Sequence, residues 1–274
     1  MRVDLGGVPE TLLWTLWYRA GEARRPDAVI DDPRAVELVA QIEYPFAERF
    51  GSADGPQAQW QALRARTFDD EVRRFAERCP GGQVVALGEG LETGYWRVGA
   101  ERLGLRWLTV DLPETIEVRR GLLGEDPPER RLLACSATDE RWLEEVDAAR
   151  GALVTAQGLL MYLQRDEIDA LFRAIGARLP GATVVFDTAP RWFATLARRG
   201  LLRTPAGYTA PPMPWGWDAL ERRRFVRAHP EIAELRELAL PVGRGLTGAA
   251  VPLLSRVPLA RDVSLVALRA SMRR

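Results

Sequence analysis

Apolar residues in the first 80 positions recur with the spacing of helices. One face of the segment 10–25 carries four apolar side chains, at Leu12, Leu13, Leu16 and Trp17. A D-D-P turn at residues 31–33 predicts the start of a second helix, and a third helix is predicted over about 59–77. We therefore expect residues 1–80 to form an N-terminal helical cap.

After residue 80 the pattern changes to short apolar strands that alternate with helices. The predicted strands cover residues 83–88, 106–111, 131–135, 151–156 and 182–187. The predicted helices cover residues 93–103, 113–122, 139–149 and 165–178. This alternation is typical of an α/β fold with a parallel sheet, and strands that are apolar throughout indicate that both faces of the sheet are buried. We expect one such domain over residues 81–274.

The rhythm breaks in residues 200–217, which contain four prolines and several aromatic residues. Such a segment is too rigid for a helix and too apolar for a free linker. We interpret it as part of a lid over about residues 191–230. Two later apolar segments, 250–254 and 263–268, are expected to form an antiparallel pair at the edge of the sheet.

Two glycines and an aspartate follow the first two predicted strands. Gly88 and Gly90 permit a tight turn and a close approach of the backbone to a ligand. Asp111 ends the next strand, where a carboxylate can accept hydrogen bonds from a ribose diol. The turn alone fits a plain connection between strand and helix equally well, but the acid at this distance favours a nucleoside site.

The composition of this loop argues against a pyrophosphate ligand. The spacing of Gly88, Gly90 and Gly94 differs from the G-x-G-x-x-G pattern of dinucleotide sites. Glu89 and Glu92 also place negative charge where a pyrophosphate would lie. A ligand with positive charge is favoured instead, and S-adenosylmethionine, which carries an ammonium and a sulfonium group, fits. An oxidoreductase that uses NAD is the disfavoured alternative.

The composition of the 274 residues indicates a globular protein without a strongly charged face. The chain has 38 basic and 38 acidic residues, all of the basic ones arginine, so a nucleic-acid partner is not expected. The two cysteines lack metal-site spacing and there is one histidine, so no metal site or disulfide is expected. Without a signal peptide or a long apolar run, we expect a cytoplasmic protein that does not enter the membrane. The oligomeric state is left open.

Several motifs in order resemble the leucine carboxyl methyltransferase superfamily, and within it the bacterial polyketide O-methyltransferases. The motifs are TLLWTLWYRAGEARRPDAVIDDPRAVELV near the start, VVALGEGLETGYWRV, VDLPETIEVRR, TAQGLLMYL, FDTAPRW and PPMPWG. The resemblance covers nearly the whole chain. It implies a Rossmann-like class I methyltransferase sheet with an N-terminal cap and an inserted lid, S-adenosylmethionine as cofactor, and a small-molecule acceptor.

The resemblance also implies roles for single residues. Those implied to contact the cofactor are Arg66 at the methionine carboxylate, Gly88 and Gly90 beside the methionine moiety, Asp111 with its neighbour Leu112 at the ribose, Ser136 and Ala137 at the adenine, and Gln157 and Gly158 from the fourth strand. Glu89 is our candidate for the ammonium group, with loop hydrogen bonding as the alternative. The chain departs from the broader family pattern at Glu92, Gly94, Ser136 and Gln157, which leaves Asp139 as a substitute adenine contact.

The nature of the methyl acceptor follows from the lack of an obvious base. A carboxylate, with a pKa of about 4, is ionised at neutral pH, whereas a phenol, with a pKa of about 10, would benefit from a general base. The chain has no lysine, and its one histidine, His229, lies outside the ligand edge of the sheet. A carboxylate acceptor is therefore favoured, although Asp187, Glu89 or Tyr162 could serve as a base for a phenol.

Candidate catalytic residues are Tyr162 above the transferred methyl group, Asp187 after the fifth strand, and Arg19, which could pair with an acceptor carboxylate. For Arg19 a salt bridge within the helical cap is an equal alternative. Candidate acceptor contacts are Trp14, Tyr18, Tyr162, Trp192, Tyr208 and Trp215, for which packing in the core is the alternative. Two rival functions remain: methylation of a phenolic hydroxyl, and a methyltransferase-like binding protein without activity.

Overall fold

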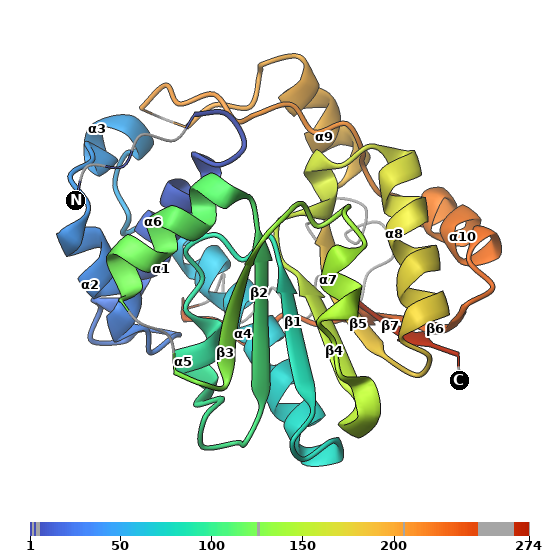
Figure 1. Cartoon of the computed structure of the whole chain (residues 1–274). Helices are drawn as coiled ribbons and strands as arrows, with labels where there is room; N and C mark the ends of the chain where they lie inside the picture. Colours follow the sequence, from blue (N-terminus) through green and yellow to red (C-terminus); the bar gives the residue numbers. More distant parts are fainter. Residues whose placement is uncertain (2, 4–5, 125–126, 205, 246–265, 274) are drawn as a thin grey trace.

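A seven-stranded sheet forms the centre of the computed structural model, which describes residues 1, 3, 6–124, 127–204, 206–245 and 266–273 (Figure 1). The strands are β1 (Gln83–Leu87), β2 (Arg106–Asp111), β3 (Arg130–Ala134), β4 (Ala152–Ala156), β5 (Thr183–Thr188), β6 (Ile232–Leu238) and β7 (Val266–Met272). Their order is β3-β2-β1-β4-β5-β7-β6. The first five strands are parallel, so their carboxyl ends meet at one edge, which is where ligands of open α/β sheets bind.

An antiparallel pair at the sheet edge is confirmed, and one of its strands, β7, overlaps the predicted segment 263–268. β7 pairs antiparallel with both β5 and β6. The expected segment 250–254 lies outside the described residues, and β7 begins at Val266 rather than Val263. β6 escaped prediction because the large apolar residues of its sequence, IAELREL, recur every three positions, which is a helical spacing rather than the alternation of a strand.

Helices cover both faces of the sheet. They are α1 (Thr11–Ala23), α2 (Pro33–Gln41), α3 (Phe46–Phe50), α4 (Pro56–Arg78), α5 (Gly94–Val98), α6 (Pro113–Leu123), α7 (Arg141–Glu144), α8 (Arg165–Arg178), α9 (Arg191–Arg198) and α10 (Ala219–Ala228), with 3₁₀ turns at Ala148–Arg150 and Leu160–Tyr162. Alternate residues of β1 point to opposite layers: Val84 and Ala86 pack with α4 and α5, whereas Val85 and Leu87 pack with α7, α8 and α10.

Two helices are shorter than predicted. The helix expected over 93–103 ends at Val98, because Gly99 adopts a left-handed conformation with φ of 66° and caps it. The helix expected over 139–149 is divided into α7 and a 3₁₀ turn. The helix α3 in the cap was not predicted, since its five residues are too few to show a period.

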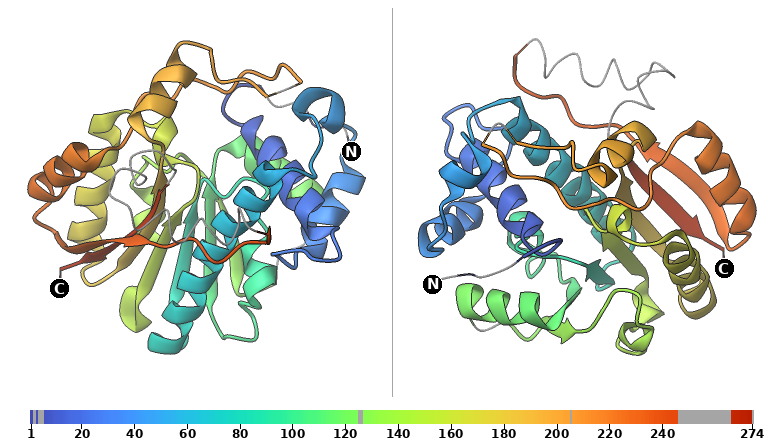
Figure 2. Two further views of the ribbon diagram at one scale, coloured as in Figure 1. Left: turned by 180° about the vertical axis from the view of Figure 1, so that it is seen from behind. Right: turned by 90° about the horizontal axis from the view of Figure 1, so that it is seen from above.

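The N-terminal helices share their core with the rest of the molecule. Leu13 and Leu38 of α1 and α2 pack in one cluster with Leu91 after β1 and Leu122 of α6. The helix α4 extends from the ligand edge of the sheet down one face, where Phe75 is buried (Figure 2). The expected boundary at residue 80 therefore does not divide two separate cores.

The expected lid over 191–230 divides into two parts. The segment after α9 crosses above the carboxyl ends of the strands toward α3, where the Thr204 hydroxyl donates to the Arg49 carbonyl at 3.4 Å (Figure 2). The later part belongs to the main core, since Trp215, Trp217 and Phe225 pack with residues of β5 and α8. Only the first part lies over the ligand edge.

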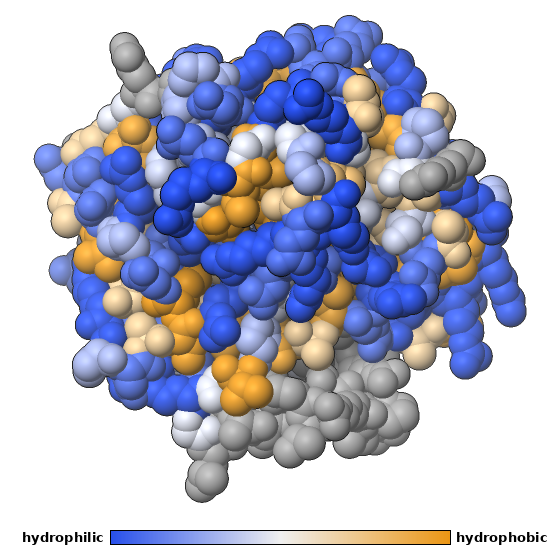
Figure 3. Space-filling model, turned by 90° about the horizontal axis from the view of Figure 1, so that it is seen from below, coloured by the Kyte–Doolittle hydropathy of each residue, from blue (hydrophilic) through white to orange (hydrophobic). Residues whose placement is uncertain are grey.

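Seen from below, the face at the amino ends of the strands is hydrophilic over much of its visible area, with apolar side chains in separate patches (Figure 3). No described residue belongs to a helix long and apolar enough to cross a membrane.

The packing of α10 gives a stability prediction. Phe225 is fully buried against Phe172 and Trp217, so Phe225→Ala should lower the free energy of unfolding by about 3–5 kcal/mol. The adjacent Val226 is 40% exposed, and Val226→Ala should change it by less than about 0.5 kcal/mol. Urea denaturation followed by circular dichroism measures both. Equal effects of the two substitutions would contradict the placement of α10 in the core.

Candidate active site

Two connected cavities lie at the carboxyl ends of β1, β2 and β4. The central cavity, under α1 and the N-terminal half of α4, measures about 760 Å³ including its open mouth, and the strand-edge cavity about 810 Å³. They share a set of lining residues: Thr11, Leu12, Gly88, Gly90, Gly158 and Tyr162. Each volume falls in the range of about 300–1,000 Å³ that is usual for small-molecule sites.

The glycine turn after β1 forms the floor between the two cavities. Gly88 and Gly90 have φ of 60° and 54°, a left-handed conformation that favours glycine. A Cβ atom on Gly90 would lie 3.1 Å from Cβ of Leu12, and one on Gly88 would lie 3.0 Å from the Leu159 side chain. Bare backbone is therefore required here both for conformation and for space.

Asp111 fastens this turn to β2. Its carboxylate accepts hydrogen bonds from the backbone N–H of Gly90 at 2.7 Å and of Leu112 at 2.8 Å. Burial raises the pKa of Asp111, and these two N–H groups oppose the rise. A carboxylate has about four lone-pair sites, so each oxygen can accept one further hydrogen bond from a diol in the strand-edge cavity.

The strand-edge cavity also brings together the residues implied at the ribose and adenine. Leu112, Ser136 and Ala137 line it, at the ends of β2 and β3. The substitute contact Asp139 does not line it; the Asp139 carboxylate pairs with Arg141 at 2.6 Å.

Glu89 lies buried under the central cavity with one oxygen available. The Thr109 hydroxyl donates to Oε2 of Glu89, and the Arg119 guanidinium lies 3.2 Å from the same oxygen. The other oxygen, Oε1, is buried and has no hydrogen-bond partner among the described residues. A cationic ligand group can supply that partner, so the chemistry of the cavity fits the ammonium of S-adenosylmethionine.

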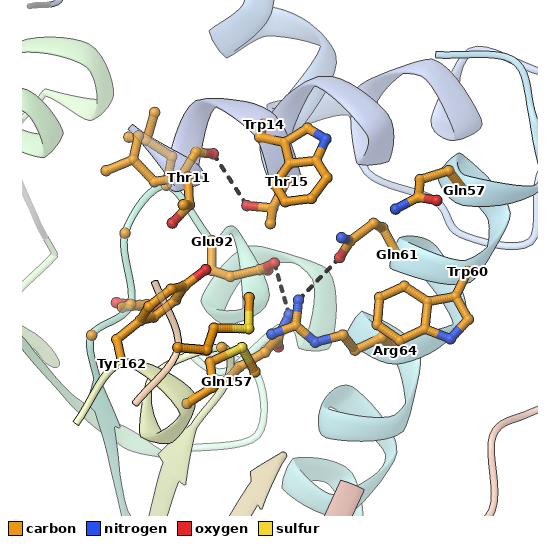
Figure 4. Close-up of a pocket in the computed structure, with 18 of the residues that line it drawn as sticks. Thr11, Trp14, Thr15, Gln57, Trp60, Gln61, Arg64, Glu92, Gln157 and Tyr162 are labelled. Carbon is orange, nitrogen blue, oxygen red and sulfur yellow. Dashed lines mark hydrogen bonds between the residues drawn. The ribbon is translucent and has the colours of Figure 1, made fainter. Parts of the chain in front are cut away.

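The arginine in the central cavity is Arg64, not Arg66. Arg64 of α4 lines the cavity, and two side chains hold its guanidinium group. It pairs with Asp187 and donates a hydrogen bond to the Gln61 side chain at 3.0 Å (Figure 4). Arg66 lies two positions later, about 200° around the helix, and lines none of the cavities described here. The resemblance placed the cation on the correct helix but on the wrong face.

Asp187 is not placed to act as a base. It is 1% exposed at the end of β5, and its carboxylate accepts from the Gly158 N–H at 2.6 Å besides pairing with Arg64. Both of its oxygens are therefore engaged away from an acceptor. Asp187 orients Arg64 against the backbone of Gly158 instead.

Arg19 is likewise unavailable to an acceptor. It is 1% exposed and binds Asp32 at 2.7 Å, Glu92 at 2.5 Å and the Leu91 carbonyl at 2.9 Å. Arg97 of α5 pairs with the same two carboxylates. The alternative of a structural salt bridge is thus correct, and the partners extend beyond the cap to the glycine loop.

Two departures from the family pattern, Glu92 and Gln157, contact one another. Burial alone would raise the pKa of Glu92, but the charges of Arg19 and Arg97 outweigh it and hold that pKa below its ordinary value. The Gln157 amide donates to Oε1 of Glu92 at 3.1 Å, and both side chains line the central cavity (Figure 4). Neutral Gln157 therefore completes the pairing without adding charge.

Tyr162 and Trp14 stand on opposite sides of the central cavity (Figure 4). Burial raises the pKa of Tyr162 to about 12, so its hydroxyl is protonated at neutral pH. Of the other proposed acceptor contacts, Tyr18 and Tyr208 line a third cavity, and Trp14 lines it as well. This cavity lies beneath the stretch that follows α9, residues 199–214, which we call the lid segment. We call this third cavity the lid cavity.

Two proposed acceptor contacts lie elsewhere. Trp215 is buried in the main core beside Trp217 at a ring distance of 5.0 Å, and Trp192 is 47% exposed on α9. Neither lines these cavities.

Sequence reasoning missed several wall residues of the central cavity: Gln57, Trp60, Gln61, Met161, Phe193 and Met213. The spacing of Gln57, Trp60, Gln61 and Arg64 places them on one helical face and could have identified the α4 wall. No comparable signal was available for Met213, which lies in a stretch without helix or strand, whereas Phe193 belongs to the helix α9, whose apolar residues have a helical spacing.

The strand order, the glycine turn and the carboxylate after β2 define a class I S-adenosylmethionine-dependent methyltransferase. The model of the leucine carboxyl methyltransferase family matches residues 13–176. The tetracenomycin polyketide synthesis O-methyltransferase TcmP of Streptomyces glaucescens is 34% identical over 219 residues, which cover 78% of this chain and 76% of that protein. This chain belongs to the leucine carboxyl methyltransferase family.

Other relatives agree with this assignment. The S-adenosyl-L-methionine-dependent methyltransferase dpfgK of Gibberella zeae is 33% identical over 187 residues, covering 64% of this chain and 62% of that protein. A crystal structure of a protein from Thermobifida fusca matches the fold with a TM-score of 0.57 over 95% of this chain and 94% of its own, at 16% identity. The protein is an S-adenosylmethionine-dependent methyltransferase.

The pairing of Asp111 predicts its effect on the cofactor. Asp111→Ala should weaken binding of S-adenosylhomocysteine by about 1–3 kcal/mol, because a buried diol would lose its acceptor. Asp70→Ala, which removes a carboxylate on the outer side of α4, serves as the control and should leave affinity unchanged. Isothermal titration calorimetry measures both, and unchanged affinity in Asp111→Ala would exclude the ribose role.

Arg64 and Arg66 form a matched pair for a second test. Removing Arg64 alone would leave the buried Asp187 unpaired, so the variant is Arg64→Met with Asp187→Asn. It should weaken binding of S-adenosylhomocysteine by about 1.5–3 kcal/mol, the usual value of a hydrogen bond to a charged group. Arg66→Met should leave the affinity unchanged, and thermal melts check that both variants fold. The reverse result would return the carboxylate contact to Arg66.

Proposed function

We propose that the protein transfers a methyl group to a carboxylate oxygen of a small aromatic, polyketide-like acid and forms a methyl ester. The relative from Streptomyces glaucescens is named as an O-methyltransferase of polyketide synthesis, which supports this class of acceptor. The walls of the central cavity support it as well. They include Trp14, Met161, Phe193 and Met213, a surface suited to an aromatic body.

The observation that carries the choice of a carboxylate is that no base is free near the acceptor. Among the described residues that line the central and strand-edge cavities, the carboxylates are Glu89, Glu92 and Asp111, and arginine or backbone N–H groups hold all three. The one oxygen of Glu89 without a partner, Oε1, is taken by the ammonium of the cofactor in this proposal. Tyr162 is protonated, with a pKa of about 12. The nucleophile therefore has to arrive already ionised, as a carboxylate does at neutral pH.

The histidine does not change this conclusion. His229 is fully buried between Phe172 and Phe225, and its ring nitrogens contact Asp169 at 2.9 Å and Glu231 at 2.6 Å. It lies among the helices that cover the sheet and lines none of the cavities at the ligand edge.

The residues of the site divide between holding the donor and orienting the acceptor. Arg64 would bind the methionine carboxylate of the cofactor, Glu89 its ammonium and Asp111 its ribose, while Tyr162 and Met161 would orient the acceptor. Bound S-adenosylmethionine supplies the methyl group of its sulfonium, and transfer to a carboxylate oxygen breaks the C–S bond, leaves the electron pair on sulfur and releases no proton. Alignment of the reactants by these side chains can lower the barrier by roughly 7–11 kcal/mol at best.

Three matched acceptors test the proposal: an aromatic carboxylic acid, its carboxamide and the corresponding phenol. Only the acid should give product, identified by mass spectrometry as an ester that alkali hydrolyses. Its kcat/KM should be nearly constant between about pH 6 and 9, because the acid titrates near pH 4 and Tyr162 near pH 12. Product from the phenol but not from the acid, with a rate that rises about tenfold per pH unit, would establish hydroxyl methylation instead.

A further inference from the structure

The lid cavity continues the central cavity away from the cofactor side. The two share Trp14, Gln57 and Phe193 as lining residues, and the lid cavity measures about 470 Å³ including its mouth. An acceptor with its carboxylate in the central cavity therefore has room to extend past Trp14 under the lid segment. The polar atoms in the walls determine which groups on that extension can form hydrogen bonds.

Two hydrogen-bond donors in the walls of the lid cavity have no partner. The indole N–H of Trp14 and the hydroxyl of Tyr208 are buried, and neither forms a hydrogen bond within the described part of the chain. The hydroxyl of Tyr18, in the same walls, donates to the Phe50 carbonyl at 2.9 Å. The indole N–H groups of Trp215 and Trp217 are also unpaired, but they lie in the main core. Trp14 and Tyr208 border a cavity, so a ligand that supplies acceptors can remove the cost of leaving their donors unpaired.

The rings that carry the two donors pack against each other in the walls of the lid cavity. The ring centroids of Trp14 and Tyr208 are 5.6 Å apart. In Figure 4 the indole nitrogen of Trp14 is directed away from Tyr162, toward the side of the view on which Gln57 lies. The donor of Trp14 is thus turned from the reacting end of the central cavity.

Both groups keep their protons near neutral pH. An indole N–H can only donate, and burial raises the pKa of Tyr208 further above its ordinary value. The matching group on a ligand is an oxygen with free lone pairs, such as a ring ketone or a quinone carbonyl. An unsubstituted hydrocarbon ring would leave both donors buried and unpaired.

We propose that the lid cavity is a subsite for an oxygen-bearing ring of the acceptor, whose ketone or quinone oxygen accepts hydrogen bonds from Trp14 and Tyr208. This inference rests on the proposed function only in taking the ligand to be an aromatic acid. It adds that the acceptor has at least one further ring, and that oxygen on that ring determines selectivity.

Calorimetry with two acids of the same shape tests the subsite. Anthraquinone-2-carboxylate carries ring oxygens and anthracene-2-carboxylate does not, and each is titrated into the protein saturated with S-adenosylhomocysteine. The quinone should bind about tenfold more tightly or better, as expected for buried donors that gain a partner. Equal binding, tighter binding of the anthracene, or no binding of either acid would overturn the proposal.

Single substitutions test whether the two donors cause the tighter binding of the quinone acid. Tyr208→Phe and Trp14→Phe each remove one donor and keep an aromatic ring, and each should reduce the preference for the quinone severalfold. Tyr44→Phe is the control, because its hydroxyl bonds Glu10 at 2.5 Å outside these cavities. A preference that survives in both variants would overturn the assignment, and thermal melts show which variants fold.

A separate assay distinguishes this inference from the proposed function. The wild-type protein is incubated with S-adenosylmethionine and the quinone acid, and the product is examined for a methyl ester. Tight binding of the quinone without ester formation would contradict the proposed reaction and still support the subsite. Ester formation from both acids at equal efficiency would support the reaction and overturn the subsite.

Discussion

A buried network of charges joins the helical cap to the glycine turn, and the shape of the site depends on it. Arg19 and Arg97 are surrounded by Asp32, Asp69 and Glu92, three carboxylates for two guanidinium groups. Burial raises the pKa of Asp69 despite its pairing with Arg97, which is consistent with this excess of acid. Loss of either arginine would leave buried carboxylates without a counter-charge, at a typical cost of about 3–5 kcal/mol. The network therefore specifies one position for α1 above the turn.

The acids around the glycine turn suit a cationic donor, and most of them are already engaged by arginine or backbone N–H groups. Acids near the donor are paired or hydrogen-bonded, and Glu89 alone among them keeps a buried oxygen without a hydrogen-bond partner in the described part of the chain. On the acceptor side the walls are aromatic and sulfur-containing, from Trp14 to Met213. Alignment in an apolar cavity is then the principal contribution of the protein to methyl transfer.

The lid segment shows how far local sequence can mislead. The prolines and aromatic residues of 200–217 predicted a lid. In the structure Trp215 packs in the main core, whereas Tyr208 packs against Phe50 of the cap. Similar residues within one irregular segment thus have different surroundings. The helix α4 gives the complementary case: its period was readable, but the resemblance pointed to Arg66 and the cavity receives Arg64.

The sequence by itself determined the five parallel strands, the glycine turn and Asp111, because strand periodicity and a left-handed turn are local properties that neighbouring residues express. Only the tertiary structure decided which charged side chains pair with one another. Arg64 meets Asp187 from 123 positions away, and Arg19 meets Glu92 from 73, so no local pattern records these pairs. The polar groups that can contact an acceptor are therefore those left without a partner once these ion pairs have formed.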